Sequence, residues 1–208
     1  SKKYLEELYE ISLEFDFIII ADECYSEIYR DEAPHSIIEV AEKNKFKNIL
    51  SFNSLSKRSN APGLRSGFVF GENNLIKKFF NLRNVSSPTV PIPIQIASEA
   101  LWNDESHVIE NRKLYNKKFE IFQNTIDKKF NFSIPSGGFF VWLKVSDFGS
   151  DEDATLKLWS EGLKVIPGSY LSVKGSNNSS ADNYIRIALV GSDSDAKQAA
   201  EIINQVLK

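Results

Sequence analysis

A lysine set between small hydroxyls and followed by an arginine is the segment of this sequence best suited to chemistry. Lys57 comes after Ser54 and Ser56, and Arg65 follows it by eight residues. The free amine of a lysine forms imines with carbonyl compounds, whereas hydroxyls and a planar guanidinium bind phosphate groups. A lone lysine is usually a solvated surface residue, but these neighbours favour a site for a carbonyl compound that carries a phosphate. The adjacent Arg58 either influences the amine electrostatically or faces solvent.

Two more polar side chains follow a short apolar run earlier in the chain. Asp22 ends the run Phe17 to Ala21, and Tyr25 stands three residues later. Alone, Asp22 would be a strand-end or helix-capping residue. Beside Tyr25, a buried carboxylate is suited to keep the nitrogen of a heteroaromatic ring protonated, while the phenol binds an oxygen on the same ring.

An arginine late in the sequence alternates with isoleucines. Arg186 stands between Ile185 and Ile187, so in a strand its side chain would lie on the face opposite to both. An arginine in such a position is often a surface or edge residue. Its forked guanidinium is also a natural partner for a substrate carboxylate, and we favour this interpretation.

The elements that would position these residues are strands of a parallel sheet. The run Phe17 to Ala21 is apolar throughout and rich in isoleucine, which is typical of a strand buried on both faces. Residues 48–53 and 66–70 predict two more strands, with irregular chain between them. Asp22 and Ser54 fall at the carboxyl ends of their strands, where open α/β sheets bind ligands.

Helical and short β patterns alternate in the remainder of the chain. Amphipathic spacing predicts helices over residues 3–15, 73–82, 94–102, 107–128, 151–161 and 193–207. Short strands are expected at residues 130–134, 138–145 and 184–190, and the polar segment 174–182 is expected to be a mobile loop. The pattern predicts the end of an α/β layer followed by a smaller α+β domain.

Composition and charge argue against several classes of protein. The chain has 208 residues, of which 42% are apolar and 25% charged, as in ordinary globular proteins. A net charge of −3 gives no general reason to bind nucleic acid or an anionic membrane, and no apolar run is long enough to cross a bilayer. The single Cys24 favours the cytoplasm, because it cannot form a disulfide within the chain. The isolated His35 and His107 form no metal motif and are expected at the surface.

The order and spacing of these residues resemble those of the fold type I, class I and II aminotransferases, which use pyridoxal 5′-phosphate (PLP). The shared pattern is Asp-x-x-Tyr, then Ser-x-Ser-Lys about 35 residues later, then the arginine, and a late Ile-Arg-Ile strand. It continues through residues 135–142 and 165–170, so the resemblance covers the whole chain. It implies that residues 1–106 are the C-terminal part of the PLP-binding large domain, with a mainly parallel sheet, and that residues 107–208 are the small α+β domain.

The resemblance also assigns roles to individual residues. Lys57 would form the Schiff base with PLP and act as general base and acid, and Arg186 would bind the substrate carboxylate. Family members form homodimers with composite active sites, and glutamate is the expected amino donor. The other contacts to PLP would come from Asp22 at the pyridine nitrogen, Tyr25 at O3′, and Ser54, Ser56 and Arg65 at the phosphate.

The segment from Ser54 to Gly67 is most similar to N-succinyldiaminopimelate aminotransferases, which serve bacterial lysine and cell-wall biosynthesis. Two positions depart from the wider family pattern: Ser59 stands where many members have an aromatic residue, and Ser66 where an aliphatic residue is usual. The phosphate cradle, the aromatic that stacks on PLP and the asparagine at O3′ have no counterpart in this sequence. We therefore expect the chain to be the C-terminal half of a longer protein, and to bind PLP poorly and be inactive alone.

Three other functions stay open. A PLP-dependent C–S lyase would share the cofactor contacts but would release ammonia and a keto acid without needing an amino acceptor. An aminotransferase for aspartate or an aromatic amino acid would differ only in substrate. A non-catalytic effector-binding domain of a transcription regulator would have a DNA-binding segment before Ser1 in place of the missing part of the cofactor site.

Overall fold

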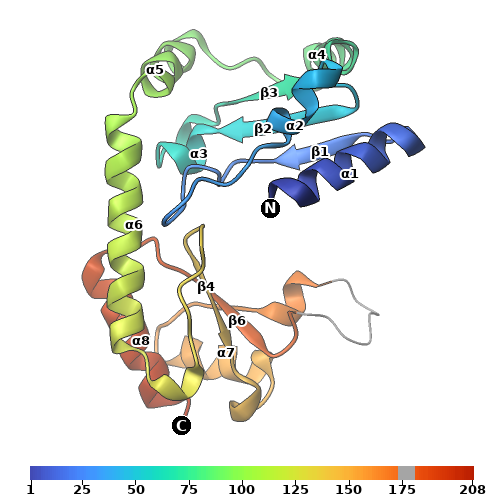
Figure 1. The fold of residues 1–208 in the computed structure, drawn as a ribbon. Helices are drawn as coiled ribbons and strands as arrows, with labels where there is room; N and C mark the ends of the chain where they lie inside the picture. The colour runs from blue at the N-terminus through green and yellow to red at the C-terminus, as the bar shows by residue number, and fades with distance from the viewer. Residues whose placement is uncertain (173–180) are drawn as a thin grey trace. The chain divides into compact units, whose positions relative to one another are not determined.

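The computed structural model describes residues 1–172 and 181–208, and most of the expected loop 174–182 lies outside these ranges. The chain divides into two compact units, Ser1–Arg112 and Lys113–Lys208, each with a sheet of its own. A 20-residue helix, α6 (Ser106–Thr125), begins in the first unit and ends in the second (Figure 1). The predicted long helix over residues 107–128 is therefore confirmed.

The first unit is built on a three-stranded sheet with the order β1-β2-β3. β1 (Ile19–Asp22) and β2 (Ile49–Ser54) run parallel, with Asp22 opposite Phe52. β3 (Gly67–Gly71) runs antiparallel to β2. All three strands lie within two residues of their predicted positions. The carboxyl ends of β1 and β2 therefore fall at the same end of the sheet (Figure 1).

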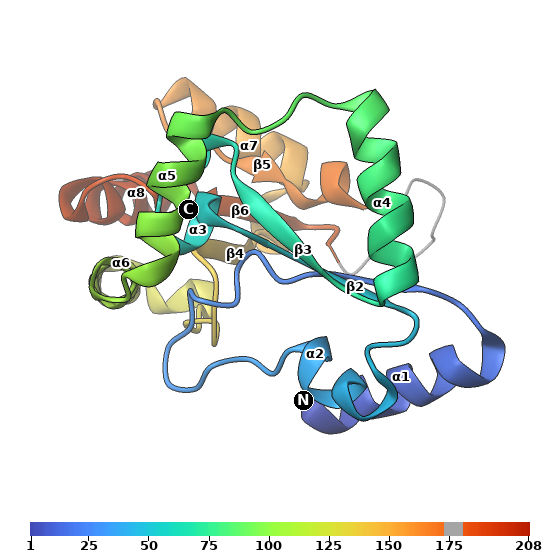
Figure 2. The same ribbon diagram turned by 90° about the horizontal axis from the view of Figure 1, so that it is seen from above.

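Two helices cover one face of this sheet. α1 (Lys2–Phe15) and α2 (Ile37–Ala41) lie on the same side of the sheet (Figure 2). They form a buried cluster with β2, in which Tyr9 and Ile37 join Ile49. The predicted helix at residues 3–15 is confirmed. The short α2 was not predicted, since five residues are too few to show a helical period.

Only one face of β1 is buried, contrary to the expectation for residues 17–21. Ile19 and Ala21 pack against the cluster of α1 and α2. On the other face, the side chain of Ile20 is 70% exposed. Successive residues of a strand point to opposite faces, so helices on a single face bury every second residue. The apolar run thus leaves one face of β1 open in this chain.

Two longer helices follow β3. They are α4 (Asn73–Ser86) and α5 (Ile92–Asn103), as the sequence predicted. Phe79 of α4 packs edge-on against Phe52 of β2, with ring centroids 5.7 Å apart. This contact attaches α4 to the strand that leads into the Lys57 segment.

The second unit has an antiparallel sheet with the order β4-β6-β5. These strands span Phe140–Lys144, Tyr184–Ala188 and Ile166–Pro167. Two helices, α7 (Asp151–Ser160) and α8 (Asp193–Val206), complete the unit (Figure 1). The predicted α+β character and both helices are confirmed, while the two-residue β5 was not predicted.

The core of the second unit is continuous across its sheet and helices. Phe119 and Phe122 of α6 are fully buried in it, together with Leu158 of α7, Ile185 of β6 and Ile203 of α8. This core joins residues that are far apart in the sequence. It is therefore the main source of hydrophobic stabilisation in this unit.

The strand expected at residues 130–134 is wrong for the described chain. A 3₁₀ turn occupies Lys128–Phe130, and Asn131 adopts a left-handed φ of 45°. Phe132 and Ile134 still pack against the core of the second unit. Their alternation therefore reports alternate burial, whereas a strand also requires a neighbouring strand to pair with.

Short 3₁₀ turns connect many of these elements. These turns span Glu42–Asn44, Pro62–Leu64, Lys128–Phe130, Ser146–Phe148 and Gly168–Leu171.

Among the residues described, no helix combines the length and apolarity needed to cross a membrane.

We expect Phe122→Ala to destabilise the second unit by about 3–5 kcal/mol, because it removes a fully buried ring and leaves a cavity. Urea denaturation followed by circular dichroism measures the change in the free energy of unfolding. Leu114→Ala on the same helix is the control, since the exposed Leu114 is expected to contribute less than about 0.5 kcal/mol. Equal losses in the two variants would contradict the core described above.

Candidate functional site

The parallel pairing of β1 and β2 brings Asp22 and the Lys57 segment to the same end of the first sheet. Asp22 is the last residue of β1, and Ser54 is the last residue of β2. The backbone N–H of Glu23 extends the ladder by donating to the carbonyl oxygen of Phe52 at 2.9 Å. This placement matches the one predicted from the sequence.

Lys57 lies on a single helical turn, α3 (Leu55–Arg58), where irregular chain was expected. Ser54 caps this turn, because its Oγ accepts a hydrogen bond from the backbone N–H of Ser56 at 3.1 Å. The Ser54 hydroxyl also lies 2.9 Å from Ser56 Oγ and 3.1 Å from the carbonyl oxygen of Ser66, and either oxygen can accept its proton. The two serines predicted to bind phosphate thus also fix the start of the turn.

Lys57 and Tyr25 lie close together. The Nζ atom of Lys57 is 5.6 Å from the centroid of the Tyr25 ring, which is within cation–π range. Asp22 is exposed rather than buried in this chain. Asp22 shares the open face of β1 with Ile20, because the two are separated by one residue along the strand.

Cys24 belongs to the same group of residues, although the sequence analysis gave it no role there. Its backbone N–H donates to Oδ1 of Asp22 at 3.2 Å. The pKa of the Cys24 thiol is raised to about 11, first by burial and then by the hydrogen bond and negative charge of Asp22, while the charge of Lys57 acts in the opposite direction. The thiol is therefore neutral at physiological pH, and its ionisation reports both neighbouring charges. In the sequence, the position of Cys24 between Asp22 and Tyr25 was the sign that it belongs to this group.

Arg65 lies in the same loop as Lys57. It follows the 3₁₀ turn Pro62–Leu64, which packs beside α3. The residue has a left-handed φ of 50°, and its Nη1 donates to the carbonyl oxygen of Pro62 at 2.8 Å. The side chain is exposed, and its predicted contact with a phosphate stays a prediction.

Arg186 lies in β6 of the second unit. Its neighbours Ile185 and Ile187 are buried, whereas Arg186 is half-buried on the other face, as alternation predicted. Its guanidinium carbon is 4.6 Å from the centroid of the Phe140 ring, which supports the side chain by a cation–π contact. The role of Arg186 toward a substrate carboxylate stays a prediction.

Glu23 fixes the end of β1, and the sequence analysis missed it. Its Oε1 accepts from the backbone N–H of Ile37 at 2.8 Å. Its Oε2 accepts from the hydroxyls of Ser36 and Ser51 at 2.8 and 2.9 Å. One carboxylate thus ties the end of β1 to the middle of β2 and to the N-terminus of α2. The signal was slight: a second acid after the apolar run, directly following Asp22.

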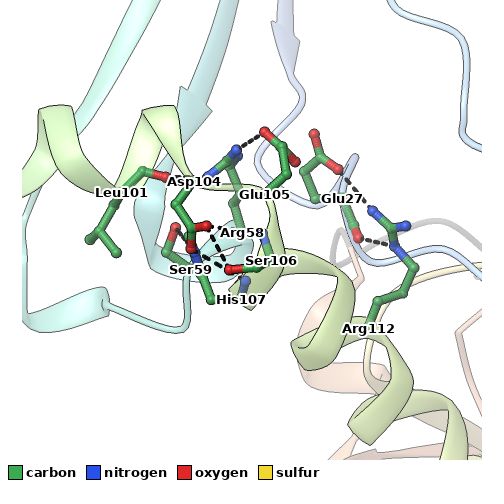
Figure 3. A network of polar contacts seen from close by, with 9 residues as sticks. All are labelled: Glu27, Arg58, Ser59, Leu101, Asp104, Glu105, Ser106, His107 and Arg112. Atoms are coloured by element: carbon green, nitrogen blue, oxygen red, sulfur yellow. Dashed lines mark hydrogen bonds and ion pairs between the residues drawn. The ribbon is translucent and has the colours of Figure 1, made fainter.

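His107 is not the plain surface residue that was expected. Its Nδ1 is hydrogen-bonded to the carboxylate of Asp104, and its Nε2 lies 2.8 Å from Oγ of Ser59 (Figure 3). Arg58 does not face solvent, since only 5% of it is exposed. Both residues join the Lys57 turn to the junction of α5 and α6, which sequence spacing does not reveal. No group of three or more His, Cys, Asp or Glu residues within the described ranges could hold a metal ion.

Comparison with known proteins establishes the family. The sequence matches the family of class I and II aminotransferases over residues 1–203. The chain belongs to this family. The predicted PLP-dependent fold of type I is thereby confirmed, and PLP is the cofactor of this family.

Solved structures support the same conclusion over nearly the whole chain. An aminotransferase from Neisseria meningitidis Z2491 is 40% identical, with a TM-score of 0.86 over 98% of this chain and 53% of its own. The aminotransferase AspB from Helicobacter pylori 26695 is 34% identical, with a TM-score of 0.87 over 100% of this chain and 54% of its own. Among curated proteins, a 4-dedimethylamino-4-oxo-anhydrotetracycline transaminase of Streptomyces rimosus is 30% identical over 88% of this chain and 49% of its own.

The chain spans about half the length of the curated relatives it matches. Two of them, an aspartate aminotransferase from Pyrococcus abyssi and an LL-diaminopimelate aminotransferase from Maridesulfovibrio salexigens, are each 28% identical. Another, an uncharacterized HTH-type transcriptional regulator of Bacillus subtilis, is 29% identical over 90% of this chain and 39% of its own. The relatives therefore include aminotransferases named for different substrates and one protein named as an uncharacterized regulator.

We expect the ionisation of Cys24 to respond to Asp22 and Lys57 in opposite directions. Asp22→Asn removes a negative charge and lowers the pKa of the thiol from about 11, whereas Lys57→Ala removes a positive charge and raises it. At a pH well below the pKa of the thiol, each unit by which this pKa falls gives about tenfold more thiolate and proportionately faster alkylation. The rate of iodoacetamide labelling between pH 7 and 11, followed by mass spectrometry, measures this. Shifts of the same sign in both variants would contradict the described grouping.

Proposed function

We propose that this chain is the C-terminal portion of a PLP-dependent aminotransferase. Residues 1–106 would form part of its large PLP-binding domain, and residues 107–208 its small domain. The observation that carries the proposal is the gathering of Asp22, Tyr25 and Lys57 at one end of a parallel strand pair, in a chain of the aminotransferase family. The reaction would convert one amino acid to its keto acid and one keto acid to an amino acid.

The residues present fit the chemistry of PLP. Near Lys57 the chain offers an amine for the aldehyde carbon, a carboxylate for the ring nitrogen and a phenol for the ring oxygen. The exposed Arg65 and the hydroxyls of Ser54 and Ser56 would hold the phosphate, since they share the loop that carries the amine. When bound, PLP supplies an electron sink for the substrate Cα.

Each side chain then has a defined task. Lys57 Nζ would hold the aldehyde carbon and, once free, would act as the general base and acid that moves a proton from the substrate Cα to that aldehyde carbon. Asp22 would keep the ring nitrogen protonated, and Tyr25 would hold the ring oxygen. Arg186 would orient the substrate by a bidentate pair with its α-carboxylate.

For the substrate pair we propose glutamate as amino donor and N-succinyl-2-amino-6-oxopimelate as acceptor, in lysine and cell-wall biosynthesis. The likeness of the segment from Ser54 to Gly67 to that branch supports the proposal, and an LL-diaminopimelate aminotransferase among the relatives acts on a related compound. Aspartate is the competing substrate, because the relative from Pyrococcus abyssi is an aspartate aminotransferase. The Arg186 carboxylate contact would serve either pair.

The whole protein would be a cytoplasmic homodimer with an active site completed by its remaining polypeptide. Two observations support the remaining polypeptide as part of the site: the relatives are about twice as long, and Asp22 is exposed in this chain. The homodimer is proposed from the resemblance to the family, and the cytoplasm from the single Cys24. A carboxylate that faces water cannot hold a ring nitrogen as firmly as one that is enclosed. We therefore expect the chain alone to bind PLP weakly.

A second candidate is the effector-binding domain of a transcription regulator. The observation in its favour is the regulator of Bacillus subtilis, which matches 90% of this chain. A DNA-binding segment upstream of Ser1 would support this function, whereas a cofactor-binding segment would support the enzyme. Sequencing the gene upstream of Ser1 separates the two.

Reduction of the intact enzyme with borohydride tests the assignment of Lys57. We expect a phosphopyridoxyl group on Lys57 in peptide mass spectra, and complete loss of this label in Lys57→Arg, whose guanidinium does not form the imine. Lys77→Arg on α4 is the matched control and is expected to keep the label. A label on another lysine of the wild-type enzyme would overturn the assignment.

Substitution of Arg186 tests its contact with the substrate. Arg186→Ala removes a charge-assisted pair worth about 1.5–3 kcal/mol, so kcat/KM is expected to fall by about 10- to 100-fold. The loss is expected with the amino acid and to be small with its α-methyl ester, which lacks the carboxylate. Steady-state kinetics on both compounds measure it, and equal losses on the two would contradict the assigned role.

A further inference from the structure

The turn that carries Lys57 is too short to hold its own shape. α3 has four residues, and isolated helices of this length are unstable because few hydrogen bonds repay the ordering of the backbone. Ser54 caps its start, and the buried Leu55 anchors its first residue. The end of the turn must therefore be held by other parts of the chain.

Arg58 directly follows Lys57, and its side chain holds this end of the turn. Its Nη1 donates to the carbonyl oxygen of Leu101 at 2.7 Å, and its Nη2 pairs with the carboxylate of Glu105 (Figure 3). The guanidinium also lies 5.0 Å from the centroid of the Trp102 ring. The carbonyl of Leu101 is in the last turn of α5, where helix carbonyls lack partners within the helix. Arg58 thus joins α3 to the end of α5.

His107 holds Ser59, the residue after Arg58. Its Nε2 lies 2.8 Å from Oγ of Ser59, and the carboxylate of Asp104 accepts a hydrogen bond from Nδ1 (Figure 3). Asp104 also accepts from the hydroxyl and the backbone N–H of Ser106 at 2.6 and 3.2 Å. These bonds hold the pKa of the Asp104 carboxyl well below its usual range, with the Ser106 hydroxyl as the largest cause. The ionised Asp104 accepts from Nδ1, so Nε2 is the ring nitrogen that bonds to Ser59 Oγ.

The start of α6, which carries His107, is itself bonded to other parts of the first unit. Arg112 donates from Nε to the backbone carbonyl of Glu27 at 2.9 Å, and its Nη2 pairs with the Glu27 carboxylate at 3.1 Å (Figure 3). Asn111 donates from Nδ2 to the backbone carbonyl of Lys57 itself at 3.3 Å. Three consecutive residues, 57 to 59, are thus bonded to the end of α5 or the start of α6.

We propose that His107, oriented by Asp104, is a positioning residue for Lys57 that acts through Ser59. The proposal rests on the proposed function in so far as Lys57 is the reactive amine. Ser59 stands where the resemblance to the family leads us to expect an aromatic residue, and a phenylalanine there would offer no hydroxyl to Nε2. We call the contacts of Ser59 with His107 and of His107 with Asp104 the brace. A reacting atom misplaced by about 1 Å can cost about 100-fold in rate. We therefore expect loss of the brace to slow the reactions of Lys57 Nζ.

Amide hydrogen exchange tests the brace without PLP. The backbone N–H groups of Ser59 and Ala61 bond to the carbonyl of Leu55, so their exchange reports the opening of α3. In the chain of 208 residues, we expect about three- to tenfold faster exchange there in His107→Asn, which retains a nitrogen for Asp104 but does not reach Ser59. His107→Gln, whose amide can reach Ser59, is expected to restore most of the protection. His35→Gln, at the exposed histidine, is the matched control.

The same variants of the intact enzyme test the consequence for Lys57. The quantity measured is the rate at which added PLP forms an imine with Lys57, trapped by borohydride reduction. We expect this rate to fall about tenfold or more in His107→Asn and to recover partly in His107→Gln. Ser59→Ala, which removes a single hydroxyl, is expected to match His107→Asn in both measurements. It also keeps the test valid if the histidine variants fail to fold.

Different outcomes separate the two proposals. Unchanged exchange and unchanged labelling in both Ser59→Ala and His107→Asn would overturn the brace while Lys57 stayed labelled in the wild type. A wild-type label on another lysine would overturn the proposed function, and the exchange measurement would still decide the brace. A covalent adduct of Ser59 with a fluorophosphonate probe would also overturn the positioning role, because it would show that this hydroxyl reacts.

Discussion

The parallel pairing of β1 with β2 is the constraint on which the candidate site depends. With Asp22 opposite Phe52, the two strands end at the same end of the sheet, so Asp22 and the Lys57 turn lie there together although they are 35 residues apart. Glu23 secures this register by binding Ser51 of β2 and the start of α2. A shift by one residue would turn Asp22 toward the cluster of α1 and α2 and separate the charges that govern Cys24.

The sequence predicted the parts of this arrangement that repeat with a period or carry a motif. The strands that end at Asp22 and Ser54, the long helices and the burial of Ile185 and Ile187 around Arg186 all follow from apolar spacing. The candidate residues came from motif order, which reflects chemistry and family rather than folding energy. The helix that carries Lys57 was missed because one turn shows no period.

The contacts that hold the turn could not be predicted, because they join side chains that lie far apart in the sequence. Arg58 and Ser59 meet their partners more than 40 residues later, at the junction of α5 and α6. An isolated histidine in polar surroundings gives no sign of such a partner, so His107 was assigned to the surface. The exposure of Asp22 was missed for another reason: an apolar run suggests burial on both faces, but only packing shows which face is covered.

Transfer of labelled nitrogen tests the central claim, that this chain supplies the reactive amine of an aminotransferase. The intact enzyme is incubated with PLP, ¹⁵N-glutamate and a keto acid acceptor, and the products are analysed by mass spectrometry in parallel with Lys57→Ala. We expect ¹⁵N to appear in the new amino acid with the wild-type enzyme, and the amount transferred to fall by orders of magnitude in the variant. Release of ¹⁵N as ammonia, or equal transfer by both proteins, would contradict it.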